Sequence, residues 1–372
     1  MPLISEINLE KCLILGLAIS CFIQVFYCLF FFLRLCFYSK KKESKKEDTP
    51  VSIIICARNE AENLQNNLSS VLNQVHKNFE VIVVNHDSTD KTETILQEFQ
   101  QDHKHLNVLH CKNNKNGKKE LITLAIKSAK HEHLIFTDAD CVPGSSNWAK
   151  NISDSFSSTK NIVIGYGPNH PKRGLLNYFF RLDTAITGIT YLSYALGKKA
   201  YMGVGRNMAY TKTLFNLLNG FDSHKEISSG DDDLFVQEAN NKTEIEINID
   251  PDTYCFSNAK TSLKSWVKQK KRHQSASIKY KVIHKGLLGI YSISLFLMWV
   301  SFVSLLIEDK YQAINLSLFC FAITIKWVIQ GGALLKLKEQ SFVFLFPLIE
   351  LFQAFAINLV FCFGSKNKKN KW

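Results

Sequence analysis

Two mostly apolar runs that flank a helical segment decide the fold, and they lie in VSIIICARNEAENLQNNLSSVLNQVHKNFEVIVVN, residues 51–85. VSIIICA (51–57) and EVIVVN (80–85) have the composition of strands that are buried on both faces of a parallel sheet. Between them, the apolar residues of Ala61–Val75 recur at helical spacing. The stretch therefore predicts a β-α-β unit with a ligand crevice at the carboxyl ends of its strands.

The same alternation continues downstream. Lys91–Gln101 predicts a helix, Asn107–His110 a strand, Gly117–Lys130 a helix and His133–Thr137 a further strand. Polar segments stand at the strand ends, namely 57–60, 85–90, 117–119 and 138–140. Neither a G-x-G-x-x-G nor a G-x-x-x-x-G-K-[ST] pattern is present, which excludes a dinucleotide Rossmann site and a P-loop ATPase.

Composition excludes several other classes. The 372 residues are 46% hydrophobic and include 27 phenylalanines, which rules out a disordered or fibrous chain. The ten cysteines form no C-x-x-C pair, so neither a zinc site nor a disulfide scaffold is expected, and a reducing compartment fits best.

An uncharged run, Cys12–Leu33, is long enough to cross a bilayer. A cleaved signal peptide is the alternative, but the run is too long for one, and neither a basic segment before it nor a small-residue cleavage site after it is present. SKKKESKK (39–46) follows, and the positive-inside rule then places the next domain in the cytoplasm.

Three more apolar stretches lie near the C-terminus: Leu287–Ile307, Ile314–Leu335 and Ser341–Phe363. Four full spans would put the basic tail outside, against the positive-inside rule, so one stretch is expected to be interfacial or re-entrant. Ser341–Phe363, which contains Pro347 and Glu350, is favoured for this. Lys326 is expected to face protein or to snorkel.

The net charge of +12 has a local source. Lys260–Lys285 contains nine Lys or Arg residues and no acidic residue, interleaved with Leu263 and Trp266. Because it lies between a polar domain and a membrane helix, we expect it to contact anionic lipid, with no nucleic acid as partner. The predicted organisation is an N-terminal anchor (1–38), a basic cytoplasmic linker (39–49), a catalytic domain (50–258), a basic amphipathic interfacial segment (259–285), about three C-terminal membrane helices (286–363) and a basic tail (364–372).

Asp138-Ala139-Asp140 places two carboxylates two residues apart after a strand. This spacing suits Mg²⁺, which takes one or two carboxylates together with substrate phosphates, although aspartates are also common in turns. Asp231-Asp232-Asp233 stands where a helix is expected to begin, and there a helix cap is the alternative to catalysis.

Seven segments together carry a likeness to a known family: Ala57-Arg58-Asn59-Glu60, Asn85-His86-Asp87-Ser88-Thr89-Asp90, Gly117-Lys118-Lys119, Asp138-Ala139-Asp140, Gly205-Arg206-Asn207, Gly230-Asp231-Asp232-Asp233 and Gln269-Lys270-Lys271-Arg272-His273. In this order they resemble the family 2 glycosyltransferases of the membrane-anchored bacterial type. The resemblance implies an α/β GT-A fold, a nucleotide-sugar-binding domain with a mostly parallel sheet, flanked by transmembrane helices.

The resemblance also implies roles for individual residues. Donor-binding residues would be Arg58, Glu60, Asp87, Lys118, Lys119, Asp138, Gln269 and Arg272; metal ligands for Mg²⁺ or Mn²⁺ would be Asp140 and Asp138; acceptor-side residues would be Gly205, Arg206, Asn207 and His273; and the catalytic pair would be Asp232 as base beside Asp231.

Two positions depart from the family pattern. His86 stands where the family usually has Asp, with Asp87 one place later, and His273 replaces the Trp of processive synthases. The implied function is a metal-dependent inverting hexosyltransferase in the plasma (inner) membrane, which moves sugar from a nucleotide-diphosphate sugar, a UDP-sugar, to a lipid-linked or cell-envelope glycan acceptor. The alternatives are a processive polysaccharide synthase and an inactive nucleotide-sugar-binding membrane scaffold.

Overall fold

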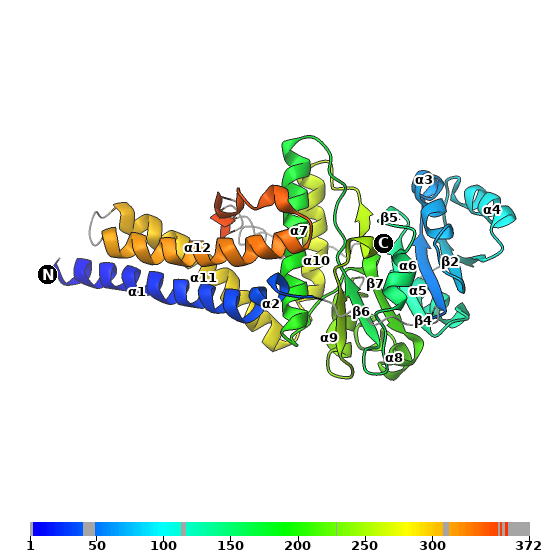
Figure 1. Ribbon diagram of the computed structural model, residues 1–372, viewed down its shortest axis with the longest axis horizontal. Coiled ribbons are helices and arrows are strands. Elements are labelled where there is room, and N and C mark those ends of the chain that lie inside the picture. Colours follow the sequence, from blue (N-terminus) through cyan, green and yellow to red (C-terminus); the bar gives the residue numbers. More distant parts are fainter. Residues whose placement is uncertain are drawn as a thin grey trace. The chain divides into compact units, whose positions relative to one another are not determined.

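The structure is a computed structural model that describes residues 3–39, 49–112, 117–227, 229–307, 312–348, 350–351 and 354–355. The chain divides into two compact units, shown in Figure 1. We call Met1–Tyr38 with Tyr280–Lys366 the helical unit, and Ser39–Lys279 with Asn367–Trp372 the sheet unit. The predicted linker (39–49) and tail (364–372) lie almost entirely outside the described residues.

A seven-stranded mixed sheet forms the centre of the sheet unit, in the order β3-β2-β1-β4-β7-β6-β8. β7 runs antiparallel to its neighbours, and the other pairings are parallel. The strands are β1 Val51–Ala57, β2 Phe79–His86, β3 Leu106–Cys111, β4 His133–Asp138, β6 Ile162–Gly165, β7 Met208–Thr211 and β8 Ile245–Asn248, and a separate small sheet pairs β5 Cys141–Pro143 with β9 Cys255–Ser257.

Helices cover both faces of this sheet. The helices of the sheet unit are α3 Ala61–Leu72, α4 Thr92–Asp102, α5 Lys118–Ser128, α6 Trp148–Ser153, α7 Leu175–Leu196, α8 Lys212–Leu217, α9 Asp233–Ala239 and α10 Leu263–Ser277. The predicted β-α-β alternation is confirmed, and most element ends agree within two residues. α3 is shorter than the predicted helix Ala61–Val75, because it ends at Leu72. Val75 is exposed, and its N–H donates to the carbonyl of Ser146.

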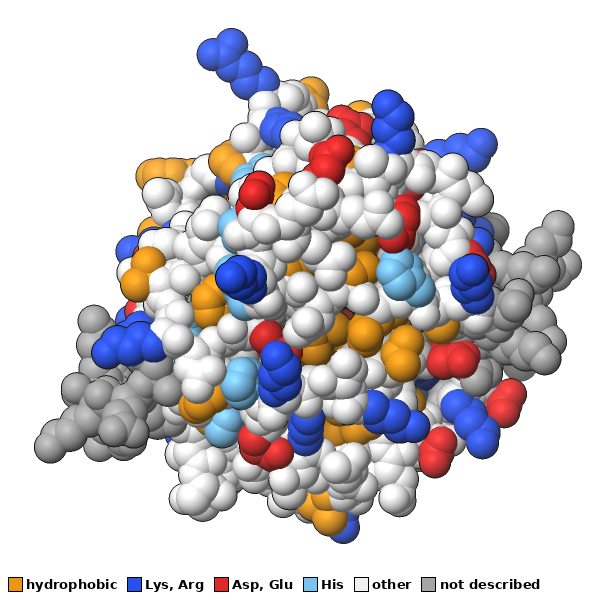
Figure 2. All heavy atoms as spheres, turned by 90° about the vertical axis from the view of Figure 1, so that its right-hand side faces the viewer, with side chains coloured by type: hydrophobic (Ala, Val, Ile, Leu, Met, Phe, Trp, Pro, Cys, Tyr) orange, Lys and Arg blue, Asp and Glu red, His pale blue; other side chains and the backbone are white. Residues whose placement is uncertain are grey.

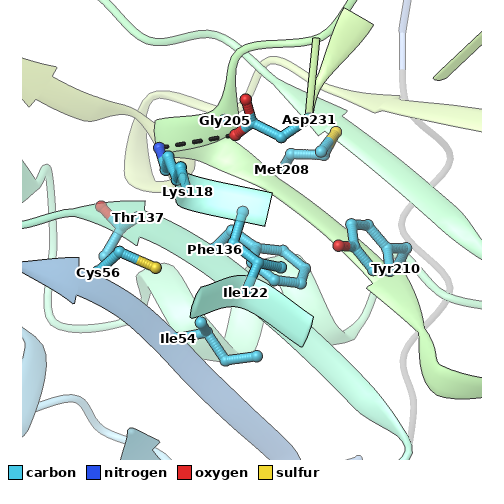
Figure 3. A pocket seen from close by; sticks show the side chains of 10 residues that line it. All are labelled: Ile54, Cys56, Lys118, Ile122, Phe136, Thr137, Gly205, Met208, Tyr210 and Asp231. Carbon is cyan, nitrogen blue, oxygen red and sulfur yellow. Dashed lines mark ion pairs between the residues drawn. The ribbon is translucent and has the colours of Figure 1, made fainter. Parts of the chain in front are cut away.

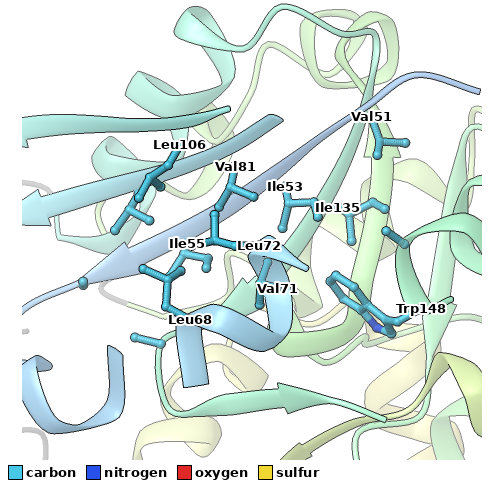
Figure 4. Close-up of a cluster of buried hydrophobic side chains, with 14 of the residues drawn as sticks. Val51, Ile53, Ile55, Leu68, Val71, Leu72, Val81, Leu106, Ile135 and Trp148 are labelled. Atoms are coloured by element: carbon cyan, nitrogen blue, oxygen red, sulfur yellow. The ribbon is translucent and has the colours of Figure 1, made fainter. Parts of the chain in front are cut away.

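Alternating side chains of β1 point to opposite faces of the sheet, as strand geometry requires. Ile53 and Ile55 join Leu68 and Val71 of α3, together with Trp148 of α6, in one buried cluster (Figure 4). Ile54 and Cys56 face the other side, where they line a hollow with residues of α5. Because both faces are covered, the open edge for chemistry is the one at the strand ends.

The helical unit contains three helices that are long and apolar enough to span a membrane: Leu9–Cys36, Val282–Ile307 and Gln312–Lys336. The first comprises α1 Leu3–Tyr27, a π-helical turn at Cys28–Phe32 and α2 Leu33–Cys36; the others are α11 Val282–Ile307 and α12 Gln312–Lys336. These agree with three of the four predicted apolar stretches. Of the fourth, Ser341–Phe363, only part is described.

Lys326 of α12 is fully buried, and its ammonium group contacts the carboxylate of Glu350 and the side-chain oxygen of Gln24. Gln24 in turn donates to Ser294 of α11 at 2.7 Å. The predicted alternative that Lys326 faces protein is therefore the one observed. Glu350 brings the middle of the fourth apolar stretch into the bundle, and Ala354, one turn later, packs in the same cluster as Leu17 of α1.

Removing one member of this buried pair should destabilise the helical unit. Lys326→Met leaves Glu350 without its cation, and the free energy of unfolding should fall by about 3–5 kcal/mol, whereas Lys326→Met with Glu350→Leu should restore most of the loss. Thermal unfolding of the detergent-solubilised protein measures this. Additive losses in the double variant would contradict it.

Candidate functional site

The parallel register brings the polar strand ends to one edge of the sheet. Cys56 of β1 is opposite Asp138 of β4, and Ala57 of β1 is opposite Asn85 of β2. Consequently the segments 57–60, 85–90 and 138–140 leave the sheet side by side, as the sequence predicts.

The first two of these segments are joined by hydrogen bonds. The N–H of Asn59 donates to the hydroxyl of Ser88 at 3.0 Å, and the side-chain oxygen of Asn59 accepts the N–H of Thr89 at 2.7 Å. The N–H of Ala61 donates to Asp90 at 3.1 Å. Asn59 itself has a φ of 54°, a left-handed conformation that is uncommon outside glycine. The two loops therefore form one cradle at the strand ends.

The departure at His86 has a structural explanation. His86 is the last residue of β2 and is buried, whereas Asp87 follows the strand with a φ of 41° and a side chain that is 40% exposed. Asp87 therefore occupies the position from which a side chain can reach a ligand. In the same cradle Arg58 is exposed and Glu60 is half-buried. Desolvation, with the charges of Asp140 and Asp138, raises the pKa of Glu60.

Lys118 connects two acidic groups that are far apart in the sequence. Its ammonium nitrogen lies 2.6 Å from Asp138 of β4. It also lies 3.8 Å from Asp231, which precedes α9, and Figure 3 marks this second contact. Gly117, with a φ of 70°, is the N-cap residue directly before Lys118, the first residue of α5. The three residues are mostly buried, with exposed side-chain fractions of 19%, 34% and 14%.

The charges of this triad shift one another's pKa values. Desolvation opposes the charge on Lys118, but Asp138 and Asp231 outweigh it and raise the pKa of the lysine. Desolvation likewise opposes the charge on Asp138, but Lys118, with Arg206 and Arg272, lowers the pKa of that carboxyl. Asp231 differs: desolvation and the neighbouring Asp232 raise its pKa even though Lys118 lowers it. Asp231 is thus more basic than an ordinary carboxylate.

Lys119 makes its hydrogen bonds away from this triad, and its donor-binding role stays a prediction. It is buried, and its ammonium group donates to the carbonyl oxygens of His224 and Ile227 at 2.6 and 2.9 Å. Desolvation lowers the pKa of Lys119 to about 8. The side chain therefore fixes the loop before α9 rather than facing the strand ends.

Asp138, Asp140 and Cys141 form a group whose ligand atoms all lie within 4.8 Å of one another. Asn67 of α3 donates to the carbonyl of Ala139 at 3.2 Å and so fixes the turn between the two carboxylates. Carboxylate oxygens suit Mg²⁺ or Mn²⁺, whereas a thiol suits softer metals. The two aspartates therefore fit the predicted ion. The thiol of Cys141 donates a hydrogen bond to Asp140 at 3.3 Å and so holds the carboxylate of that residue.

The start of α9 explains why three aspartates stand together. Asp232 caps the helix: one carboxylate oxygen accepts the N–H of Asp233 at 2.8 Å, and the other accepts the N–H of Gly205 at 3.2 Å. Asp233 is buried. Only Asp231 of the three lines the hollow beside Lys118, as Figure 3 shows. The capping alternative thus applies to Asp232, while Asp231 faces the site.

Gly205-Arg206-Asn207 is held by the end of β6. Asn207 is buried, donates to the carbonyls of Tyr166 and Thr253, and accepts the indole N–H of Trp148. A Cβ on Gly165 would lie 2.4 Å from the Asn207 amide nitrogen, which explains a glycine there. The side chain of Asn207 thus holds this loop in place, and its acceptor-side role stays a prediction.

Arg206 remains near the site. It donates to the carbonyl of Gly167, and a Cβ on that glycine would lie 2.6 Å from the Arg206 Nε. Gly165 and Gly167, which the sequence analysis did not single out, are thus the residues that let the Arg206 loop dock. Their spacing, G-x-G directly after an apolar run, was the available signal.

α10 carries the remaining predicted residues. Gln269 is partly buried, and Arg272 and His273 are exposed. The charge of Arg272 contributes to the lowered pKa of Asp138, so α10 lies within electrostatic reach of the strand ends.

On the face of the molecule drawn in Figure 2, Lys and Arg side chains are interspersed with Asp, Glu and His rather than gathered in one patch.

Comparison with known proteins agrees with this geometry. Residues 52–217 match the family model "Glycosyl transferase family 2". A poly-β-1,6-N-acetyl-D-glucosamine synthase of Staphylococcus epidermidis is 32% identical over 101 residues, which cover 27% of this chain and 24% of that protein. WfaP of Escherichia coli, a UDP-Glc:α-D-GlcNAc-diphosphoundecaprenol β-1,3-glucosyltransferase, is 29% identical over 140 residues, covering 37% of this chain and 50% of that protein. The aligned regions therefore span between a quarter and a half of these relatives.

A solved structure shares the fold over nearly the whole chain. The mannosyltransferase PcManGT of Pyrobaculum calidifontis, solved in complex with GDP-Man and Mn²⁺, superimposes with a TM-score of 0.59 at 17% identity and covers 94% of this chain and 99% of that one. The predicted GT-A fold is thus confirmed.

The structural role of Asn207 is testable. Asn207→Ala leaves two buried carbonyls and one indole N–H without their partner, so the free energy of unfolding should fall by about 2–4 kcal/mol. Arg206→Ala removes a hydrogen bond to one carbonyl, that of Gly167, so the free energy of unfolding should fall by less. Thermal unfolding of both variants measures the difference, and equal losses would contradict this assignment.

Proposed function

Because residues 52–217 form a glycosyl transferase family 2 domain, we propose that the protein is a membrane-bound glycosyltransferase. It transfers a sugar from a nucleotide-diphosphate sugar to a lipid-linked or cell-envelope glycan acceptor. The observation that carries the proposal is the contact of Lys118 with both Asp138 and Asp231. This contact places a cation between a carboxylate suited to a metal ion, Asp138, and Asp231, a carboxylate whose pKa is raised.

The interlocked loops 57–60 and 85–90 form the nucleoside end of the donor site. Arg58, Glu60 and Asp87 are the side chains that bind the nucleoside and its ribose there. Ordered by the bonds between Asn59 and the Ser88-Thr89 segment, the cradle is pre-formed before the donor arrives, which lowers the entropic cost of binding.

Asp138 and Asp140 hold Mg²⁺ or Mn²⁺, since their oxygens lie close enough to reach one ion. When bound, the ion supplies positive charge to the diphosphate. Further cations surround the diphosphate, namely Lys118, Arg206 and Arg272. Gln269 of α10 adds a hydrogen-bond donor.

The acidic pair before α9 supplies the base. The acceptor hydroxyl attacks the anomeric carbon from the face opposite the diphosphate, the bond from that carbon to the diphosphate oxygen breaks, and configuration inverts. The hydroxyl proton passes to a carboxylate. The sequence favours Asp232, but both of its oxygens accept backbone N–H groups, whereas Asp231 lines the hollow with a raised pKa. We therefore assign the base to Asp231, with Asp232 holding the Gly205 loop. Arg206 of that loop and the exposed His273 of α10 are assigned to the acceptor side.

The helical unit anchors the enzyme as a multi-pass protein of the plasma membrane. The end of α12 meets the end of α2, because a Cβ on Gly332 would touch Cys36, and Tyr27 of α1 bonds the carbonyl of Leu287 near the start of α11. Arg34, Lys285, Lys336 and Lys338 are thus gathered at one end of the bundle. By the positive-inside rule this end is cytoplasmic, so the catalytic domain works on cytosolic donor, and the basic segment 259–285 meets anionic lipid.

The relatives support a lipid-linked acceptor and a UDP-sugar, since WfaP is named for UDP-Glc and a diphosphoundecaprenol acceptor. The alternative, a processive synthase, is supported by the poly-N-acetylglucosamine synthase relative. His273 in place of the aromatic residue favours few additions. The inactive-scaffold alternative is disfavoured by the paired Lys118, Asp138 and Asp231.

Donor hydrolysis by the detergent-purified protein tests the proposal, with a panel of UDP- and GDP-sugars in Mg²⁺, Mn²⁺ or EDTA. We expect release of nucleoside diphosphate from one donor, lost in EDTA and reduced on the order of a hundredfold or more in Asp140→Ala and Asp231→Asn. Lys119→Gln is the matched control for the neighbouring position, with an effect on stability larger than its effect on turnover. Turnover that survives Asp231→Asn but not Asp232→Asn would return the base to Asp232, and no turnover of any donor or acceptor would refute the enzyme.

The pH dependence follows from the charges around Asp231. A base works only when deprotonated, so turnover should fall as the pH drops through the pKa of Asp231. Lys118 lowers that pKa, so its removal in Lys118→Met should move the acidic limb of the residual activity to higher pH, and Lys118→Arg should move it less. Rate profiles between pH 4 and pH 8 measure this shift, and an unmoved limb would exclude Asp231 as the titrating group.

A further inference from the structure

A single carboxylate of α7 holds the helix that carries Gln269 and Arg272. One oxygen of Asp183 accepts the indole N–H of Trp266 at 3.0 Å and lies 2.7 Å from the ammonium group of Lys270. Trp266 and Lys270 are one turn apart on α10, so Asp183 bridges consecutive turns of the helix. α7 and α10 run side by side in the sheet unit (Figure 1).

α10 is held at its C-terminal end by the hydrogen bond of 2.9 Å between Ser275 and Ser229 and by the buried Ala276, and in its N-terminal half by Asp183. It is the most basic helix of the sheet unit, and a fifteen-residue helix with adjacent like charges is marginal by itself. In its N-terminal half the buried apolar side chain is Trp266, 9% exposed, whose ring lies edge-on to Phe179 at 5.3 Å and stacks on Phe180 at 6.2 Å. Ring contacts alone tolerate sliding, whereas the two polar contacts to one oxygen define a direction.

The rotation of α10 about its own axis decides in which direction the side chains of Gln269 and Arg272 point. Successive residues of an α-helix are about 100° apart, so a rotation by one position would turn Arg272 by more than a quarter of a circle. Gln269 and Arg272, which the proposed function assigns to the diphosphate, lie within two residues of Lys270 on this helix, so the contact of Lys270 with Asp183 constrains their direction too. Asp183 also supplies a negative charge beside Lys270, which offsets the repulsion between Lys270 and its neighbours Lys271 and Arg272.

We propose that Asp183 is a positioning residue, whose carboxylate sets the rotation of α10 so that Gln269 and Arg272 face the diphosphate of the donor. The inference rests on the proposed function and deepens it. The signal in the sequence is that Asp183 is the one acidic residue of the helix Leu175–Leu196, in which Arg181 is the other charged residue.

A double-mutant cycle between Asp183 and Arg272 tests the proposal, with donor turnover of the full-length protein as the assay. Asp183→Ala should lower kcat on the order of tenfold to a hundredfold with a smaller change in KM, because Arg272 acts on charge that develops as the diphosphate leaves. In an Arg272→Ala background the same substitution should have little further effect. Asp183→Asn, which keeps an acceptor for Trp266 but loses the charge, and Trp266→Phe, which keeps the packing but loses the N–H, should each show a part of the loss.

Glu246→Gln is the control variant. It removes an ion pair of the same kind, with Lys160 at 2.5 Å, between residues that the site does not use. It should change thermal stability as much as Asp183→Asn does and leave kcat unchanged. Multiplicative losses in the double variant, or a fall in kcat that follows thermal stability alone, would overturn the positioning role. Absence of turnover in the unsubstituted protein would instead refute the proposed function, so the two failures are distinguishable.

Discussion

The parallel register of β1 with β2 and β4 is the constraint on which the site depends. It places Ala57, Asn85 and Asp138 in neighbouring rows at the ends of their strands. Parallel strands need crossover connections, and here α3 and α4 make them on one face while α5 lies on the other. Every polar segment that follows a strand is thereby delivered to the same edge, and a one-residue slip would turn those side chains to the opposite face of the sheet.

Charge compensation holds the delivered groups together. Asp138, Asp231 and Lys118 are each costly to bury alone, and their mutual contacts offset that cost. The same logic recurs at α10, where Asp183 meets Trp266 and Lys270, and in the helical unit, where Glu350 and Gln24 meet Lys326. In each place a charged side chain joins elements distant in the sequence, so that charge specifies which elements meet.

Several residues near the site stabilise their surroundings instead of facing a ligand. Lys119 and Asn207 belong to segments that resemble family motifs, but their polar atoms are bonded to backbone carbonyls. Asp232 shares its oxygens between the start of α9 and the Gly205 loop. A motif therefore contains both residues that contact the ligand and residues that shape the loop, and the hydrogen-bond partners tell the two apart.

The sequence by itself determined the β-α-β alternation, the three apolar helices and the polar strand ends, because burial patterns and strand-end chemistry are local properties of the chain. The resemblance also assigned Lys118 and Lys119 to the donor. Only the tertiary structure decided that Lys118 contacts Asp138 and Asp231, that Asp231 rather than Asp232 lines the hollow, and that Asp183 holds α10. Those distinctions depend on which side of a helix start or loop meets a segment a hundred residues away, and long-range contacts of this kind leave no periodic trace in the sequence.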